Sequence, residues 1–255
     1  MKTQTRILSA VMAGAMMMSL AGCSGSSDSM TVEEGKLTMA TNAFFPPYEY
    51  YDGDTIVGID AEIAQAIADK LGMELEIVDI EFDSIIAGIQ AGKYDMGMAG
   101  MTVTEDRLKS VNFSTTYATA VQQIIVTEDS EITSVDDLIG GDYIVGVQSG
   151  TTGDIYMTDD VGEDRVDRYQ KGNDAVVALT SGKVDAVCID SEPAKAFIAA
   201  NEGLKILDTP YVEEEYAIAI AQDNTELLDA INGALDELIA DGTVDSIVSK
   251  YITAD

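Results

Sequence analysis

The chain has 255 residues, 46% of them hydrophobic, and its 46 acidic and 14 basic residues give a formal net charge of -32. This balance argues against a nucleic-acid partner, because proteins that bind phosphate backbones need clustered Lys and Arg. The chain has no His and only Cys23 and Cys188, so the usual zinc ligands and the commonest general base are missing, and we expect no metal and no cofactor.

The N-terminal segment is typical of an export signal with a lipid-attachment site. A short basic start precedes an apolar run over 7–20. About 14 helical residues span roughly 21 Å, less than the ~30 Å hydrocarbon core, so a cleaved signal peptide over 1–22 fits better than a transmembrane helix. The run ends in Leu20-Ala21-Gly22-Cys23, which resembles the bacterial lipobox; an ordinary signal with a chance cysteine is the alternative. We expect a lipid on Cys23 and a flexible tether over 23–35.

From Lys36 onward, short apolar runs alternate with amphipathic segments. Strands are expected at 37–40, 75–80 and 96–99, and helices at 60–71 and 83–91. Asp60 is the expected N-cap of the first helix, and Gly72 is its expected stop. Strands that alternate with helices indicate parallel pairing and an α/β fold.

One pattern occurs twice. The segment 83–95 reappears ninety positions later as 173–185, and each copy predicts a helix that ends at Gly, followed by Lys-x-Asp and a strand. In the same register, Gly100 and Asp190 stand at corresponding positions at the ends of the two strands. Two similar α/β units in tandem would each present a strand C-terminus, which is where ligands bind in open α/β sheets. Coincidence is the alternative, because a helix, a glycine and a strand form a common connection.

The last segment, 225–251, predicts two helices whose apolar faces need a partner. A chain of two lobes supplies one if these helices return to the first lobe. The expected division is lobe 1 over 36–119 and 219–255, lobe 2 over 120–218, and crossings near 117–123 and 214–218.

Five segments, in the same order along the chain, match motifs of a known family: 40–49 (ATNAFFPPYE), 58–60 (GID), 95–107 (DMGMAGMTVTEDR), 148–151 (QSGT) and 185–190 (DAVCID). From Lys36 to its end the chain resembles the polar amino-acid group of the bacterial extracellular solute-binding proteins, family 3. The resemblance implies a two-lobed Venus-flytrap fold of the type II-like periplasmic binding proteins, with two α/β domains joined by two crossing hinge strands. It implies a monomeric receptor without catalytic activity that delivers an L-amino acid to an ABC transporter permease.

A bound α-amino acid is a zwitterion, and burying it requires a partner for each charge. Arg107 suits the carboxylate because its planar guanidinium can form two parallel hydrogen bonds. The resemblance adds the backbone N–H groups of Thr102 and Thr152 to this subsite. It assigns the α-ammonium to Asp190, the Gly100 carbonyl and the Thr102 hydroxyl. Each lobe then holds mainly one charge, so the ligand favours the closed form.

The resemblance also implies that Phe45 and Phe82 sandwich the ligand side chain. The other expected ligand-binding residues are Asn42, Met101, Gln148 and Thr151. Structural alternatives stay open for several of these residues. The aromatic residues could belong to the hydrophobic core, and Met101, like Met96 and Met98, is interpreted as a residue that fills the core.

Three charged positions have structural alternatives. Arg107 could be a solvated helix residue paired with a neighbouring acid, and Asp190 could cap the helix that begins at Ser191. The run Glu213-Glu214-Glu215 is expected to form a solvated acidic turn.

The pocket is expected to be neutral, amide-lined and partly apolar. Asn42 stands where glutamine- and cation-binding members of the family often carry an acidic residue, and Gln148 stands where the glutamine-binding member has Lys. Ile189 replaces a polar residue before the ligand aspartate. We therefore expect a neutral polar or apolar amino acid rather than a strongly charged one.

Two other functions stay open. One is a dehydratase-like enzyme on the same fold, for which the sequence offers no evident acid–base pair. The other is a sensor or adaptor that binds ligand and signals to a membrane kinase; the lack of a second apolar run near 20 residues indicates that it is not itself a transmembrane receptor domain. In the preferred interpretation, that of a transport receptor, the protein lies outside the cytoplasm and is held at the membrane by the lipid on Cys23.

Overall fold

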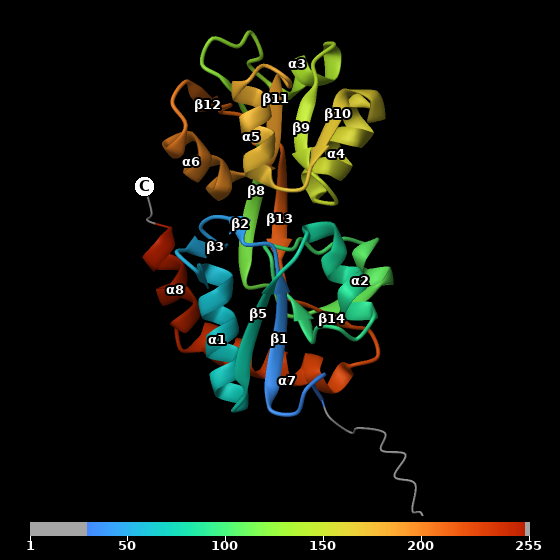
Figure 1. Ribbon diagram of the computed structural model, residues 1–255, viewed down its shortest axis with the longest axis vertical. Helices are drawn as coiled ribbons and strands as arrows, with labels where there is room; N and C mark the ends of the chain where they lie inside the picture. Colours follow the sequence, from blue (N-terminus) through green and yellow to red (C-terminus); the bar gives the residue numbers. More distant parts are fainter. Residues whose placement is uncertain (1–29, 253–255) are drawn as a thin grey trace, which may run out of the picture.

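The computed structural model describes residues 30–252 (Figure 1). Cys23 and the expected signal peptide therefore lie outside the described residues. The chain forms two α/β lobes, drawn one above the other in Figure 1 and joined by long strands. No helix in the described part is both long and apolar enough to cross a membrane.

Lobe 1 is built on a five-stranded sheet in the order β5-β1-β6-β14-β7. Its strands are β1 (Lys36–Thr41), β5 (Glu74–Asp79), β6 (Met96–Gly97), β7 (Val111–Phe113) and β14 (Ala219–Ala221). Strand β1 is parallel to β5 and β6, as the alternating pattern predicts, whereas β14 runs antiparallel to β6 and β7. A small antiparallel sheet lies on the side of lobe 1 that faces lobe 2; it consists of β2 (Phe44–Phe45), β3 (Glu49–Asp52) and β4 (Thr55–Val57).

The helices of lobe 1 include both predicted C-terminal helices. They are α1 (Ile59–Leu71), α2 (Ile85–Gln90), α7 (Thr225–Ala240) and α8 (Thr243–Tyr251), with short 3-10 turns η1 (Phe82–Ser84) and η2 (Arg107–Lys109). Helices α7 and α8 pack against α1, and the apolar face of α7 is buried there, with Leu227, Ile231 and Leu235 fully inaccessible. The apolar face of α7 thus has its partner in α1.

Lobe 2 has a sheet in the order β10-β9-β11-β8-β12, with β13 paired to β8. Its strands are β8 (Ala118–Thr127), β9 (Val145–Gln148), β10 (Val166–Tyr169), β11 (Ala186–Asp190), β12 (Leu204–Ile206) and β13 (Val212–Tyr216). Its helical elements are α3 (Val135–Gly140), α4 (Thr152–Val161), η3 (Glu163–Arg165), α5 (Gly172–Thr180) and α6 (Ser191–Ala200).

The chain crosses between the lobes twice. It passes from β7 in lobe 1 to β8 in lobe 2, and returns from β13 to β14 (Figure 1). Strands β8 and β13 are antiparallel partners, with Val212 opposite Gln122 and Tyr216 opposite Ala118. The two connections therefore form one hydrogen-bonded ribbon between the lobes.

The repeated sequence pattern folds in the same way in each lobe. The glycine after each helix adopts a left-handed φ, 64° for Gly92 and 68° for Gly182. The Asp95 amide donates to the Thr38 carbonyl, and its carboxylate accepts the Thr38 amide. Asp185 forms the same reciprocal pair with Ile144. The correspondence extends to individual hydrogen bonds, so the two units are structural equivalents.

Two expectations about local structure are wrong. Gly58, and not Asp60, is the N-cap of α1; Asp60 is fully buried and accepts hydrogen bonds from the Gly100 amide and the Tyr117 hydroxyl. The three glutamates from Glu213 to Glu215 lie in β13 and form no turn. Because side chains alternate along a strand, the outer two point to solvent while Glu214 is buried. The expected stop of α1 at Gly72 is confirmed by its left-handed conformation.

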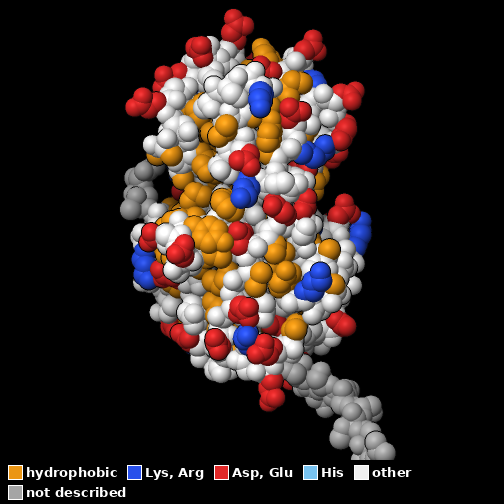
Figure 2. Space-filling view, viewed as in Figure 1, with side chains coloured by type: hydrophobic (Ala, Val, Ile, Leu, Met, Phe, Trp, Pro, Cys, Tyr) orange, Lys and Arg blue, Asp and Glu red, His pale blue; other side chains and the backbone are white. Residues whose placement is uncertain are grey.

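Residues 30–35, which the sequence assigns to the tether, contact lobe 1. The Val32 amide donates to Asp95, and the Asn224 side chain donates to the Met30 carbonyl. The folded body therefore includes residues from Met30 onward. Acidic side chains are scattered over the visible surface of both lobes, and Lys and Arg are fewer (Figure 2).

Candidate functional site

A pocket lies between the lobes, and residues of both lobes line it. The residues that line it are Asn42, Phe45, Glu49, Phe82, Ala99, Gly100, Thr102, Arg107, Gln148, Thr151, Thr152 and Asp190. The structure thus brings together every expected ligand-binding residue except Met101. The Met101 side chain is fully buried in an apolar cluster of lobe 1, which agrees with its interpretation as a residue of the hydrophobic core.

Arg107 enters the pocket from the η2 turn of lobe 1. Its side chain is buried; Nη1 donates to the Thr102 carbonyl at 2.7 Å, and Nη2 donates to the Gly150 carbonyl of lobe 2 at 3.0 Å. The alternative of a solvated, acid-paired arginine is wrong, because the neighbouring Asp106 pairs with Lys109. Burial lowers the pKa of Arg107, and the charges of nearby acids oppose that shift. The guanidinium is a buried cation at the boundary between the lobes.

Asp190 enters from the opposite lobe, at the C-terminus of β11. By position it is the N-cap of α6, but its side chain makes no capping hydrogen bond, so the capping alternative fails. Its Oδ2 accepts a hydrogen bond from Gln122 Nε2 at 2.9 Å, while its buried Oδ1 has no partner within residues 30–252. Burial, followed by the charge of Glu214, raises the pKa of Asp190 well above its usual value. A cationic group at this position would therefore gain a strong partner.

Backbone donors complete the side of the pocket near Arg107. Thr151 is the N-cap of α4, and its hydroxyl accepts the Asp154 amide, which leaves Thr152 as the first helical residue. The backbone amides of Thr102 and Thr152 donate no hydrogen bond in the described part of the chain. A helix N-terminus with a free N–H group favours an anion. The arrangement suits a carboxylate between these amides and the guanidinium.

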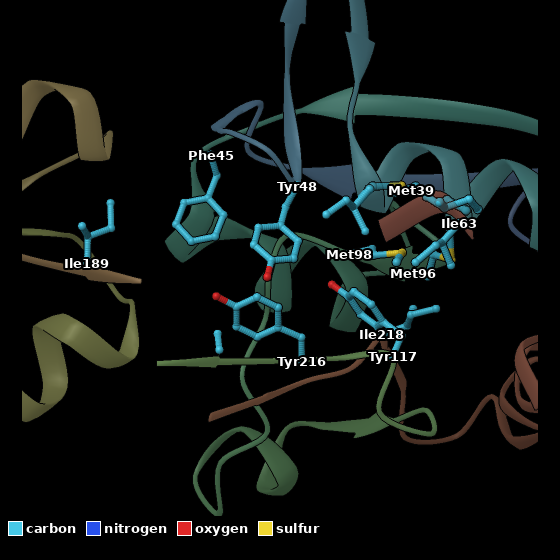
Figure 3. Close-up of a cluster of buried hydrophobic side chains, with 14 of the residues drawn as sticks. Met39, Phe45, Tyr48, Ile63, Met96, Met98, Tyr117, Ile189, Tyr216 and Ile218 are labelled. Carbon is cyan, nitrogen blue, oxygen red and sulfur yellow. The ribbon is translucent and has the colours of Figure 1, made fainter. Parts of the chain in front are cut away.

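Aromatic rings form the walls. Phe45 and Phe82 are both almost fully buried, and the Arg107 guanidinium lies 5.3 Å from the centre of the Phe82 ring. Figure 3 shows Phe45 beside Tyr48, with Ile189 of lobe 2 on the other side of Phe45. The rings of Phe45 and Tyr48 are 5.9 Å apart. Each of the two rings thus packs on another buried group.

Two amides meet across the pocket. Gln148 Nε2 of lobe 2 donates to Asn42 Oδ1 of lobe 1 at 2.9 Å. Asn42 Nδ2 donates in turn to the Ile80 carbonyl, and Gln148 Nε2 also donates to the Gln170 carbonyl. The amide lining expected from the sequence is thus present and joins the two lobes.

The sequence analysis missed Glu49 as a pocket residue. It is 1% exposed, and its Oε2 has no hydrogen-bond partner within the described residues. Burial, followed by the charge of Asp60, raises the pKa of Glu49 well above its usual value. The sequence feature that could have indicated Glu49 is its position between two aromatic residues, Tyr48 and Tyr50, because an acidic residue with aromatic neighbours on both sides is a candidate for burial.

The site has the chemistry of a receptor for a small zwitterion. It offers a guanidinium with two backbone N–H groups at one place and a partly unpaired carboxylate at another, contributed by different lobes. In residues 30–252, no group of three His, Cys, Asp or Glu side chains is arranged to hold a metal ion.

Comparisons with known proteins agree with this description. Residues 37–254 match the family model of bacterial extracellular solute-binding proteins, family 3. The arginine-binding extracellular protein ArtP of Bacillus subtilis (strain 168) is 34% identical over 255 residues, covering 96% of this chain and 97% of the relative. The ABC transporter glutamine-binding protein GlnH of the same organism is 32% identical over 203 residues, covering 78% of this chain and 74% of the relative.

Solved structures agree as well. The P235GK mutant of ArgBP from T. maritima has a TM-score of 0.81 and 40% identity, covering 86% of this chain and 96% of that one. An ancestral arginine-binding protein bound to glutamine has a TM-score of 0.82 and 39% identity, covering 87% of this chain and 100% of that one. The fold is therefore the two-lobed α/β fold expected from the sequence, and the chain belongs to the bacterial extracellular solute-binding proteins, family 3.

Proposed function

We propose that this protein captures a free L-amino acid outside the cytoplasm by closing its lobes on it, and delivers it unchanged to an ABC transporter permease. The observation that carries the proposal is the pair Arg107 and Asp190, which come from different lobes and line one buried pocket. The guanidinium would hold the ligand carboxylate, and the Asp190 carboxylate would hold its α-ammonium. The relatives named for arginine and glutamine binding support an amino-acid ligand.

Closure follows from the same geometry. When the lobes separate, Arg107 loses the Gly150 carbonyl, and Gln148 loses Asn42. A zwitterion bound to one lobe alone would have a partner for only one of its charges. Because both charges are satisfied together only in the closed form, ligand binding shifts the population toward closure.

For the ligand side chain we favour a cationic group, with arginine as the leading candidate. Glu49 supplies a carboxylate to the pocket, with one oxygen unpartnered in the described residues, and several relatives are named for arginine. A buried guanidinium would stabilise the ionised form of Glu49. The neutral or polar side chain expected from the sequence is the second candidate, and the amide pair of Asn42 and Gln148 favours it.

A thermal-shift panel tests both the function and the side-chain class. The panel contains the twenty amino acids with ornithine, cystine and citrulline, added to the purified mature protein. A ligand at a thousand times its Kd stabilises the folded state by roughly 4 kcal/mol, which gives a clear rise in melting temperature. Citrulline is the matched control for arginine, because it has nearly the same shape without the charge. Preference for arginine supports a cationic ligand, equal or better binding of citrulline or glutamine supports a neutral one, and a flat panel contradicts the proposal.

Delivery and location need tests in cells. Deletion of the gene should abolish uptake of the labelled ligand, and the wild-type chain but not the Arg107→Ala variant should restore it. We place the protein at the outer face of the membrane through a lipid on Cys23. The Cys23→Ser variant should then lose incorporation of labelled fatty acid and leave the membrane fraction. A variant that still incorporates the label would contradict the anchor.

A further inference from the structure

Glu214 lies next to the ammonium-binding carboxylate. Gln122 Nε2 donates to Asp190 Oδ2 at 2.9 Å and to Glu214 Oε2 at 3.0 Å, so one nitrogen joins the two carboxylates. Both side chains are buried, and each has a second oxygen, Oδ1 or Oε1, without a partner in residues 30–252. Glu214 does not line the ligand pocket itself; it lies on the hinge strand β13, where its Oε2 accepts a hydrogen bond from the pocket residue Thr102.

The surroundings offer this pair of acids little positive charge. The titratable groups that face it are Arg107, Glu49, Tyr48, Tyr156, Cys188 and Tyr216. Of these, Arg107 alone is a cation, and its side-chain hydrogen bonds within residues 30–252 go to backbone carbonyls. Two like charges held close together in a buried site repel each other, and this repulsion favours the protonated form of Asp190.

We propose that Glu214 is a second carboxylate of the ammonium site, whose charge favours the protonated form of Asp190 in the ligand-free protein, and that Asp190 releases this proton when the ligand binds. This inference rests on the proposed function. The balance is simple: the α-ammonium enters with its charge of plus one, and the proton of Asp190 leaves to solvent. The raised pKa of Asp190, caused by burial and by the charge of Glu214, agrees with this coupling.

Glu214 also orients the ligand acceptors. The Thr102 hydroxyl donates to Glu214 Oε2 at 3.0 Å, so its oxygen lone pairs stay available to accept from an ammonium. Gln122, held by the same carboxylate, keeps its N–H groups toward Asp190. Glu214 is thus a positioning residue that fixes two groups of the site, Thr102 from lobe 1 and Asp190 from lobe 2.

Calorimetric titration of the mature protein with L-citrulline, and with L-glutamine as a second probe, tests the inference, because their neutral side chains bring no charge to Glu49. At one pH near 7, binding is measured in several buffers that differ in ionisation enthalpy. The slope of the observed enthalpy against buffer enthalpy gives the number of protons released. For the wild type we expect a release approaching about one proton, because the pair holds one before binding.

Variants assign the proton to its source. The Glu214→Gln variant should bind with a clearly smaller release than the wild type, because Asp190 loses the neighbouring like charge that favours its protonated form. Glu213→Gln and Glu215→Gln are matched controls, since they remove the same charge from exposed positions of the same strand, and both should match the wild type. Wild-type binding without proton release would overturn the inference, even if no variant folds. An undiminished release from Glu214→Gln would also overturn it and indicate the Glu49 and Asp60 pair as the source. Absence of binding heat from every amino acid would overturn the proposed function, and this inference with it.

Discussion

Lys171 of lobe 2 places its ammonium nitrogen 3.5 Å from the centre of the Phe44 ring of lobe 1. Neither residue lines the ligand pocket. The contact is a cation–π interaction that exists only while the lobes are closed. It therefore stabilises the closed form without touching the ligand.

We expect Lys171→Met to weaken ligand binding by about 2- to 5-fold, the equivalent of the ~0.5–1 kcal/mol of an exposed cation–π pair. The loss should lie mainly in the dissociation rate, because the contact forms after the ligand has been captured. Stopped-flow fluorescence gives both rate constants. Lys183→Met is the matched control, since it removes the same charge from an exposed site of lobe 2. A change confined to the association rate would contradict the assignment.

The zwitterion clamp gives the largest expected effect. Arg107→Ala should weaken amino-acid binding by about 3–5 kcal/mol, the range for removing one partner of a buried ion pair. Asp190→Ala should lose a similar amount. Lys109→Ala is the control, because it removes a basic side chain from the same turn at an exposed position. Titration calorimetry measures the affinities, and circular dichroism confirms that each variant is folded. Normal binding by either pocket variant would show that its role in the clamp is wrong.

A glycine is required at position 100 because the backbone there passes close to the Phe45 ring. Its φ is +52°, and a Cβ atom there would lie 2.7 Å from the Phe45 ring. We expect Gly100→Ala to cost about 3 kcal/mol of stability, through left-handed strain and steric overlap together, and to abolish detectable binding.

The matched control for this variant is Gly92→Ala. Gly92 has a φ of +64°, but a Cβ there would meet no atom within 4 Å. This variant should lose only about 1–2 kcal/mol, the cost of the left-handed conformation, and should bind normally. Urea unfolding separates the two effects. Equal destabilisation by both substitutions would show that the Phe45 contact is unimportant.

Much of the fold could be predicted because its signals are local. Helices that end at a left-handed glycine, such as those before Gly92 and Gly182, are visible in the sequence, and so is the alternation that favours parallel strands. The pocket residues beside strand ends, Gly100 and Asp190, could be placed for the same reason. Strand ends in an α/β sheet meet at one edge, so their positions in sequence determine their meeting in space.

The missed residues lie within strands. Gln122 and Glu214 belong to the two strands that join the lobes, and Glu49 begins a short strand beside the pocket. Whether the buried face of such a strand points to a core or to a cleft depends on how the two lobes are arranged. The three consecutive glutamates therefore predicted a solvated turn. The burial of the middle one arises from the pairing of β13 with β8, which the local sequence does not indicate.

Asp60 gives the protein a dependence of stability on pH. Burial raises its pKa to about 6, against the hydrogen bonds from the Gly100 amide and the Tyr117 hydroxyl. In the unfolded chain an Asp loses its proton near pH 4. Between about pH 4 and 6 the folded state therefore binds more protons than the unfolded state. Stability from this group falls as the pH rises through that window, and the loss of about 3 kcal/mol is complete above it.

Asp60→Asn removes the titration while keeping the shape, and one amide oxygen can accept both hydrogen bonds that now reach Oδ2. At pH 4, where Asp60 is protonated in the folded protein, variant and wild type should unfold at similar urea concentrations. At pH 7 the variant should be the more stable, because no buried charge has to be desolvated. Asp54→Asn, at an exposed position, should follow the wild type throughout. Urea midpoints measured from pH 4 to 7 decide the matter: parallel curves for Asp60→Asn and the wild type would mean that Asp60 ionises in the folded protein as readily as in the unfolded chain.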